Sequence, residues 1–310
     1  MMEKIERYKH LNKYLKEKFG ERTLKICIDG GFTCPNRDGT KGTSGCIFCS
    51  EKGSGEHIKN SYSTTSTLQT NTIIRNNTKI ALDYCYAKIS AQVKKYFQSY
   101  KAERANKFIA YFQNFTNTYD SLENLKKKYD AALIDERIVG LEVATRPDCI
   151  TENIAELLKS YTNNYYVCVE LGLQTANEET GNLINRCYNN ENFTKAVTIL
   201  NKYVIDVVTH IMLGLPKNTK EIENHKDIAT TVNFINQHSI QGLKIHSCYV
   251  VKNTKLEEMY LARKIHSFDI RTIFRRMCLC YFAHFSRYCY TSYIGRCPKR
   301  FTRSTKLECS

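Results

Sequence analysis

Short apolar runs alternate with helix-like segments along most of the chain. The runs are rich in Val, Ile, Tyr and Cys and lack a strict alternation of apolar and polar positions, which is typical of strands covered on both faces. We therefore predict strands at 23–28, 107–113, 138–144, 165–171, 204–212 and 242–250. Helices are predicted between them, at 83–101, 119–130, 151–161, 177–186, 192–203, 220–237 and 255–266.

Six strand–helix units predict a parallel sheet with right-handed crossovers, which makes the fold class α/β and the architecture an open or partly closed barrel. Residues 1–22 carry apolar positions at helical spacing and are expected to form an N-terminal helix. The core is expected at 23–267, interrupted by a polar insertion or loop at 53–82 that is rich in Ser, Thr and Asn. Ligand-binding side chains should gather at the carboxyl ends of the strands.

The composition indicates a globular protein without a membrane partner. Charges run through the first nineteen residues, which a signal peptide would not show, and no apolar stretch is long enough to span a bilayer. Fourteen cysteines without an export signal favour reduced thiols and a cytoplasmic location. In that compartment, clustered cysteines indicate metal or redox chemistry more often than disulfides.

The net charge of +15 is concentrated at the C-terminal end. The last 42 residues hold nine Lys or Arg and two acidic residues, and so supply +7 of the total. The remaining +8 is spread over 268 residues. This modest excess permits a nucleic-acid partner but does not by itself indicate one.

The segment 268–310 does not match the rest of the chain. It holds five of the fourteen cysteines and shows no apolar period, so we interpret it as an atypical basic, Cys-rich tail that is poorly ordered and makes few contacts with the barrel. A shift of the reading frame in the gene would explain it. A basic extension that binds RNA or metal is the alternative. The tail carries no functional inference.

The stretch CPNRDGTKGTSGCIFC brings three thiols, Cys34, Cys46 and Cys49, into one loop after the first strand. Structural zinc takes four ligands, so Cys27 or His57 would have to complete a zinc site. A [4Fe–4S] cluster bound by three thiolates instead leaves one iron open to the amine and carboxylate of a small molecule. The loop therefore has four interpretations, which are zinc, an iron–sulfur cluster, a disulfide or no bound group at all.

Five strings in order carry a family resemblance: CIDGGFTCPNRDGTKGTSGCIFCSEKGSGE, YFQNFTNTY, GLEVATRPDCI, VELGLQTAN and HIMLGLP. Over about residues 5–265 the chain resembles the radical S-adenosylmethionine (SAM) superfamily. Within it, the chain is similar to the Elp3-like branch and its YhcC- or YtqA-like subfamily. The spacing C-x11-C-x2-C is that of this branch rather than the commoner C-x3-C-x2-C.

The resemblance implies a partial (β/α)6 TIM-like barrel of the radical SAM type. It also implies a [4Fe–4S] cluster on Cys34, Cys46 and Cys49. Reductive cleavage of SAM would give a 5′-deoxyadenosyl radical that abstracts hydrogen from a substrate, with an electron donor such as flavodoxin or ferredoxin. The substrate implied is tRNA, at the side chain of a wobble uridine. A non-catalytic zinc-binding nucleic-acid module is the alternative from another functional class.

The resemblance also points to polar residues after the second predicted strand. Asn114, Thr116 and Asn117 stand where the superfamily binds the amine of the methionine moiety. A polar turn would explain the same residues without a ligand.

Three further residues are cofactor-binding candidates. Glu170 lies inside an apolar run, where a carboxylate needs a partner, so we expect it to contact the ribose or amine of SAM rather than to form a structural ion pair. Gln174 shares this expectation. Arg186 is expected to pair with the methionine carboxylate. Its string INRCYN departs from the INRGHN-like form of the subfamily, which puts the neighbouring contacts in doubt. No catalytic residue is assigned.

Overall fold

Six parallel strands form the centre of the structure. The computed structural model describes residues 9–53, 78–218, 221–265 and 289–290. The strands pair in the order β2-β3-β4-β5-β6-β7. Their bounds are β2 (Thr23–Ile28), β3 (Lys107–Phe112), β4 (Ile138–Thr145), β5 (Tyr166–Gln174), β6 (Asp206–Leu213) and β7 (Gly242–Ser247). Each strand overlaps a predicted run, which confirms the α/β class.

Two short strands extend the sheet beyond β7, in the order β7-β8-β1. β1 (Lys9–His10) pairs with β8 (Cys289–Tyr290), which pairs in turn with β7. The helix predicted over 1–22 is therefore wrong at residues 9–10, and helix α1 spans only Leu11–Phe19. The tail contributes β8, which pairs with β7 at two positions, and the expectation that the tail makes few contacts with the barrel stays a prediction. The other tail residues after 268 and residues 54–77 of the predicted insertion lie outside the described residues.

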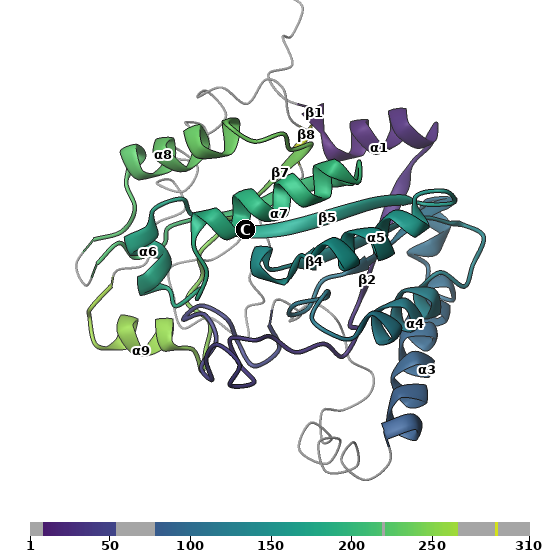
Figure 1. Ribbon diagram of the computed structural model, residues 1–310, viewed down its shortest axis with the longest axis horizontal. Coiled ribbons are helices and arrows are strands. Elements are labelled where there is room, and N and C mark those ends of the chain that lie inside the picture. Colours follow the sequence, from purple (N-terminus) through teal and green to yellow (C-terminus); the bar gives the residue numbers. More distant parts are fainter. Residues whose placement is uncertain (1–8, 54–77, 219–220, 266–288, 291–310) are drawn as a thin grey trace, which may run out of the picture.

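The helices lie between the strands in sequence, as predicted, and Figure 1 shows α5 and α7 in front of β4 and β5. They are α1, α3 (Thr78–Phe97), α4 (Leu122–Ala132), α5 (Glu152–Tyr161), α6 (Glu178–Leu183), α7 (Asn190–Lys202), α8 (His225–Asn236) and α9 (Lys255–Leu261), with 3-10 turns η1 (Ala102–Arg104) and η2 (Pro147–Cys149). α3 begins inside the predicted polar insertion. None of the helices in the described ranges has the length and apolar character that crossing a membrane needs.

The sheet is curled into a partial barrel. In a flat sheet β2 and β7 would lie about 24 Å apart, at five strand spacings. Lys25 on β2 and Lys244 on β7 nevertheless both reach the carboxylate of Glu170 on β5, each at 2.9 Å. Because opposite edges share one partner, the inner face encloses a space, called the lumen below. This confirms the predicted partial barrel.

The two faces of the sheet differ in polarity. Side chains such as Ile26, Phe112 and Val143 are almost completely buried in one continuous hydrophobic core. Alternate positions, such as Lys25 and Glu142, face the lumen. The apolar face therefore binds the sheet to its helices, whereas the inner face carries the polar groups.

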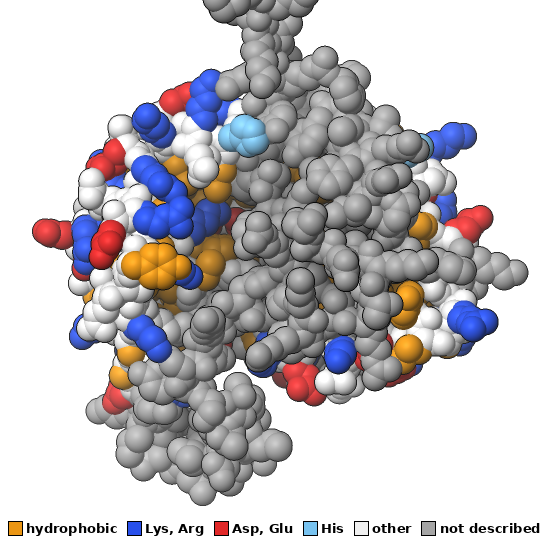
Figure 2. Space-filling view, turned by 180° about the vertical axis from the view of Figure 1, so that it is seen from behind, with side chains coloured by type: hydrophobic (Ala, Val, Ile, Leu, Met, Phe, Trp, Pro, Cys, Tyr) orange, Lys and Arg blue, Asp and Glu red, His pale blue; other side chains and the backbone are white. Residues whose placement is uncertain are grey.

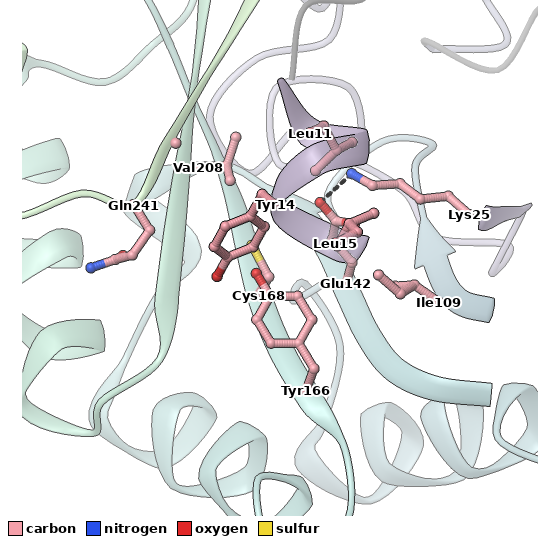
Figure 3. Close-up of a pocket in the computed structure, with 11 residues that line it drawn as sticks. Leu11, Tyr14, Leu15, Lys25, Ile109, Glu142, Tyr166, Cys168, Val208 and Gln241 are labelled. Atoms are coloured by element: carbon pink, nitrogen blue, oxygen red, sulfur yellow. Dashed lines mark hydrogen bonds and ion pairs between the residues drawn. The ribbon is translucent and has the colours of Figure 1, made fainter. Parts of the chain in front are cut away.

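Helix α1 closes the amino end of the barrel. Its Leu15 is 2% exposed, and the hydroxyl of Tyr14 donates to Asp206 on β6 at 3.0 Å. Between α1 and the strands lies a cavity of about 20 Å³, lined among others by Lys25 and Glu142 (Figure 3). This is room for about one water molecule. The cavity is therefore too small for an organic ligand.

Candidate active site

The cysteine loop lies at the carboxyl end of the sheet. It follows β2 directly and is drawn in dark purple below the sheet in Figure 1. Its first turn forms at Cys34, whose carbonyl accepts the backbone N–H of Arg37 at 2.8 Å. Its last turn joins two cysteines, since the N–H of Cys49 donates to the carbonyl of Cys46 at 2.9 Å. Backbone turns therefore fix the positions of all three cysteines.

Two glycines are needed for this path. Gly45 has a φ of +71°, a left-handed conformation that strains other residues. A Cβ at Gly42 would come within 2.5 Å of Oδ1 of Asn36. Larger residues at either position would displace the loop.

Two side chains near the start of the loop anchor it. Asn36 is completely buried, and its amide donates to the carbonyl of Asn185 at 2.6 Å. The same amide nitrogen lies 3.8 Å from the sulfur of Cys46. Arg37 donates to the carbonyl of Cys49 at 2.9 Å, which ties the start of the loop to its end.

None of the three cysteines is in a disulfide with another described residue, and all three are partly buried. Burial, with the nearby Cys49 and Cys34 acting in the same direction and Arg146 opposing them, raises the pKa of the Cys46 thiol to about 12. In the described part of the chain, no three His, Cys, Asp or Glu side chains are grouped closely enough to hold one metal ion. A cluster places a separate iron against each thiolate, so its ligands lie farther apart than those of a zinc ion. His57, which the zinc interpretation names as a possible ligand, lies outside the described residues, so the zinc and iron–sulfur interpretations of the loop both stay predictions.

A buried arginine lies beside the first cysteine. Arg146 follows β4 directly, and its Nη1 lies 4.0 Å from the sulfur of Cys34. Its Nε and Nη2 donate to the two carboxylate oxygens of Asp148, both at 2.9 Å. Asp148 also accepts from Lys41 of the cysteine loop at 2.5 Å. These contacts tie the loop to the end of β4.

The polar residues predicted after β3 are buried next to the cysteine loop. The N–H of Thr116 donates to the carbonyl of Thr33 at 3.2 Å. Asn117 also has a structural role, since its amide donates to two backbone carbonyls at 3.2 and 2.7 Å. The side-chain oxygens of Asn114, Thr116 and Asn117 have no hydrogen-bond partner among the described residues. Buried oxygens of this kind fit a ligand that donates hydrogen bonds.

Gln174 ends β5 at the same edge of the sheet. Its φ of +67° is left-handed, and its Nε2 lies 2.8 Å from where a Cβ of Gly172 would stand. The lack of a side chain at Gly172 therefore makes room for the amide. Its contact with SAM stays a prediction.

The guanidinium of Arg186 is engaged within the chain. Its five N–H donors have five partners at 2.6 to 3.0 Å, which are the carbonyls of Leu173, Thr175 and Tyr188, the carboxylate of Glu178 and the side-chain oxygen of Asn190. Arg186 is 1% exposed. It therefore holds the end of β5 to the following loop. Its contact with the methionine carboxylate stays a prediction and would require it to give up one of these bonds.

The string INRCYN departs from the subfamily form at Cys187. This residue has a φ of +58°, which explains why glycine is favoured there. Its thiol donates to Oδ1 of Asn36 at 3.2 Å. The departure therefore adds a contact to the anchor of the cysteine loop.

Glu170 is at the centre of a charged network in the lumen. Its Oε1 accepts from Lys25 and its Oε2 accepts from Lys244, both at 2.9 Å. Tyr111 also donates to Oε2, and Nε2 of His210 lies 2.7 Å from the same atom. The structure thus shows the structural ion pair that the sequence analysis placed second. The contact of Glu170 with SAM stays a prediction.

A second carboxylate shares one of these lysines. Glu142 on β4 accepts from Lys25 at 2.5 Å, the bond drawn in Figure 3. Burial raises the pKa of Glu142 to about 8, with Lys25 opposing this effect and Glu170 adding to it. Burial also disfavours the ionised form of Glu170, but Lys244 and Lys25 outweigh it and hold its pKa well below the usual range. Glu170 is therefore the permanent anion, and Glu142 is a site where a proton can be held.

Sequence reasoning missed most of this network. The sequence analysis assigns no role to five of its members, which are Lys25, Tyr111, Glu142, His210 and Lys244. The available signal was a polar residue at alternate positions inside each apolar run, such as Lys in TLKICI and Glu in GLEVAT. A strand covered on both faces by apolar layers would carry no such residues.

Two family models match the chain. The model described as the radical SAM superfamily matches residues 34–229 and thus begins at Cys34. The model described as the radical SAM C-terminal domain matches residues 240–301. The second match runs into the predicted atypical tail, for which the frame shift stays a prediction.

Individual proteins and solved structures are also similar to the chain. YtqA of Bacillus subtilis is 35% identical over 84% of this chain and 72% of its own length. The tRNA uridine(34) acetyltransferase of Methanocaldococcus infernus is 32% identical over 45% of this chain and 25% of its own length. The solved structure of the archaeal Methanocaldococcus infernus Elp3 with an N-terminal deletion has a TM-score of 0.59 at 16% identity, covering 89% of this chain and 57% of that one. The chain therefore spans little more than half of that Elp3 chain, and the likeness in structure shows the fold.

Proposed function

Because the chain belongs to the radical SAM superfamily, we propose that it is an enzyme that binds a [4Fe–4S] cluster through Cys34, Cys46 and Cys49 and uses SAM. When bound, the cluster supplies the electron that cleaves SAM to methionine and a 5′-deoxyadenosyl radical, which abstracts hydrogen from the substrate. The observation that carries the proposal is the set of three thiols fixed in one loop at the mouth of the barrel. A small electron carrier such as flavodoxin or ferredoxin would deliver the electron.

Buried polar atoms beside the loop support the use of SAM. The oxygens of Asn114 and Thr116 are suited to accept hydrogen bonds from the ammonium group of a methionine moiety. Both residues are buried, so a ligand there would supply the hydrogen-bond partner that these oxygens otherwise lack. In the proposal, these two residues hold the amino acid end of SAM.

Anaerobic reconstitution tests the cluster. We expect a brown protein with about four iron and four sulfide per chain, which releases 5′-deoxyadenosine from SAM in the presence of dithionite. Alanine at Cys34, Cys46 and Cys49 together should abolish iron binding, whereas Cys168→Ala, on β5 and outside the loop, should retain it. A triple variant with its full iron content would contradict the proposal. A colourless protein with one zinc ion would favour the non-catalytic zinc-binding alternative.

We propose tRNA as the substrate, at the side chain of the wobble uridine. The support is the relative named as a tRNA uridine(34) acetyltransferase and a group of Lys and Arg side chains that Figure 2 shows on one side of the molecule. Exposed basic residues on the elements that Figure 1 places on that side include Lys13, Lys16 and Lys18 of α1 and Lys94 and Lys95 of α3. Such side chains attract a phosphate backbone.

Nucleoside analysis of cellular tRNA tests the substrate. One modified uridine that is present in the tRNA of cells with the gene should be missing from cells without it. Its unmodified or partly modified precursor should accumulate instead. Identical nucleoside profiles in the two strains would contradict the tRNA proposal, without bearing on the cluster.

A further inference from the structure

One cation is held against the cysteine loop with little freedom to move. Arg146 is 8% exposed and Asp148 accepts two of its N–H groups in a bidentate pair. The centre of its guanidinium lies 4.8 Å from the ring of Tyr188. Two hydrogen bonds and a cation–π contact hold the guanidinium in place, so its position does not depend on a ligand.

The free end of this guanidinium faces a proposed cluster ligand. Nε and Nη2 are used by Asp148, and Nη1 lies 4.0 Å from the sulfur of Cys34. Lys41 also contacts Asp148, at 2.5 Å, but its side chain is 39% exposed. Arg146 is therefore the buried cation of the group, and Lys41 acts as the tether of the loop.

A fixed cation beside a ligand sulfur changes the relative stability of the oxidised and reduced forms of the metal centre that the sulfur binds. A thiolate-bound [4Fe–4S] cluster gains one negative charge when it accepts an electron. A neighbouring positive charge lowers the free energy of the reduced form more than that of the oxidised form, and burial strengthens this effect because less water screens it.

We propose that Arg146 is a positioning residue that raises the reduction potential of the cluster, so that a low-potential carrier can reduce it. Asp148 fixes the guanidinium and partly offsets its charge. The inference rests on the proposed cluster at Cys34, Cys46 and Cys49. It predicts shifts of opposite sign when the cation and its counter-charge are removed.

The test is a redox titration of the reconstituted protein, followed by the electron paramagnetic resonance signal of the reduced cluster. Arg146→Gln should shift the midpoint potential to more negative values, and Asp148→Asn should shift it to more positive values. Arg146→Lys keeps the charge and should shift it less than Arg146→Gln. Arg137→Gln is the matched control, since Arg137 pairs with both oxygens of Asp135 at 2.8 Å outside the cysteine loop, and it should leave the potential unchanged.

The outcomes separate this inference from the proposed function. A wild-type protein that binds no cluster would contradict the proposed function. An Arg146→Gln protein with a full cluster and the wild-type potential would overturn the role of Arg146. If Arg146→Gln binds no cluster, Asp148→Asn decides, because a potential that does not become more positive also overturns it. A purely structural role would change iron content and thermal stability but not the potential of the clusters that form.

Discussion

Replacing Glu170 with alanine is expected to lower the free energy of unfolding by about 3–5 kcal/mol, the typical cost of removing one partner from a buried ion pair. Glu170 is completely buried, and Lys25 and Lys244 both depend on its carboxylate for their charge balance in the lumen. Without it, Lys25 keeps its ion pair with Glu142, whereas Lys244 keeps no carboxylate partner among the described residues. Urea unfolding of the two proteins at neutral pH measures the effect.

The pH dependence of this loss of stability tests whether the charge of Glu170 causes it. The lysines hold the pKa of Glu170 below its ordinary value of 4.5, so its contribution to stability is present above that value and is lost as the pH falls through the folded-state pKa. The difference in stability between wild type and Glu170→Gln should therefore shrink in acid. A difference that stays constant would contradict the ion-pair explanation. Glu123→Gln, which removes one exposed partner of Lys127, should change stability little.

The Glu170→Gln variant also tests the predicted contact between Glu170 and SAM. If folded Glu170→Gln binds SAM as the wild type does, the cofactor contact predicted for Glu170 is wrong and its role is to balance charge in the lumen. Weaker binding with an unchanged cluster spectrum would support the contact.

Replacing Arg186 with methionine should also destabilise the protein, by about 3–5 kcal/mol. Methionine fills much of the volume of the arginine stem but donates no hydrogen bonds. The carbonyls of Leu173, Thr175 and Tyr188 would lose their charged donor in a buried site, and the end of β5 would lose its link to the following loop. Chemical unfolding with the cluster-free protein measures this loss.

A matched arginine provides the control. Arg137 is 42% exposed and pairs with Asp135 near the surface, so Arg137→Met should cost far less than Arg186→Met. If the two variants are equally stable, the buried hydrogen bonds of Arg186 do not hold this part of the fold. If Arg186→Met is stable but binds SAM weakly, the predicted carboxylate contact is the better explanation.

The strands were predictable because their apolar face has to be continuous. Runs such as TLKICI place large apolar residues at every second position on the outer face, where Ile26 and Ile28 pack in the core. Helix ends were less predictable. The N-terminal boundary failed at Lys9–His10 because its strand pairs with β8, about 280 residues later in the chain.

The cysteine loop and the lumen differ in what a sequence can reveal. Three cysteines and their spacing are visible locally, so the candidate ligands could be named from the chain alone. The partners of Glu170 come from β2, β3, β6 and β7, and they become neighbours only when the sheet curls. The same holds for Arg146 and Cys34, which are 112 residues apart. Local sequence patterns do not reveal contacts between residues that are so far apart in the chain.

The shared carboxylate of Glu170 also has a consequence for the order in which the chain assembles. Lys25 precedes Glu170 by 145 residues and Lys244 follows it by 74. Contacts between such distant residues form only after long loops have closed, so the centre of the lumen is expected to form late and slowly. On the ribosome, Lys25 emerges long before both of its carboxylate partners, Glu142 on β4 and Glu170 on β5, and remains hydrated until they are made. The barrel is complete only after β7 has left the ribosome exit tunnel.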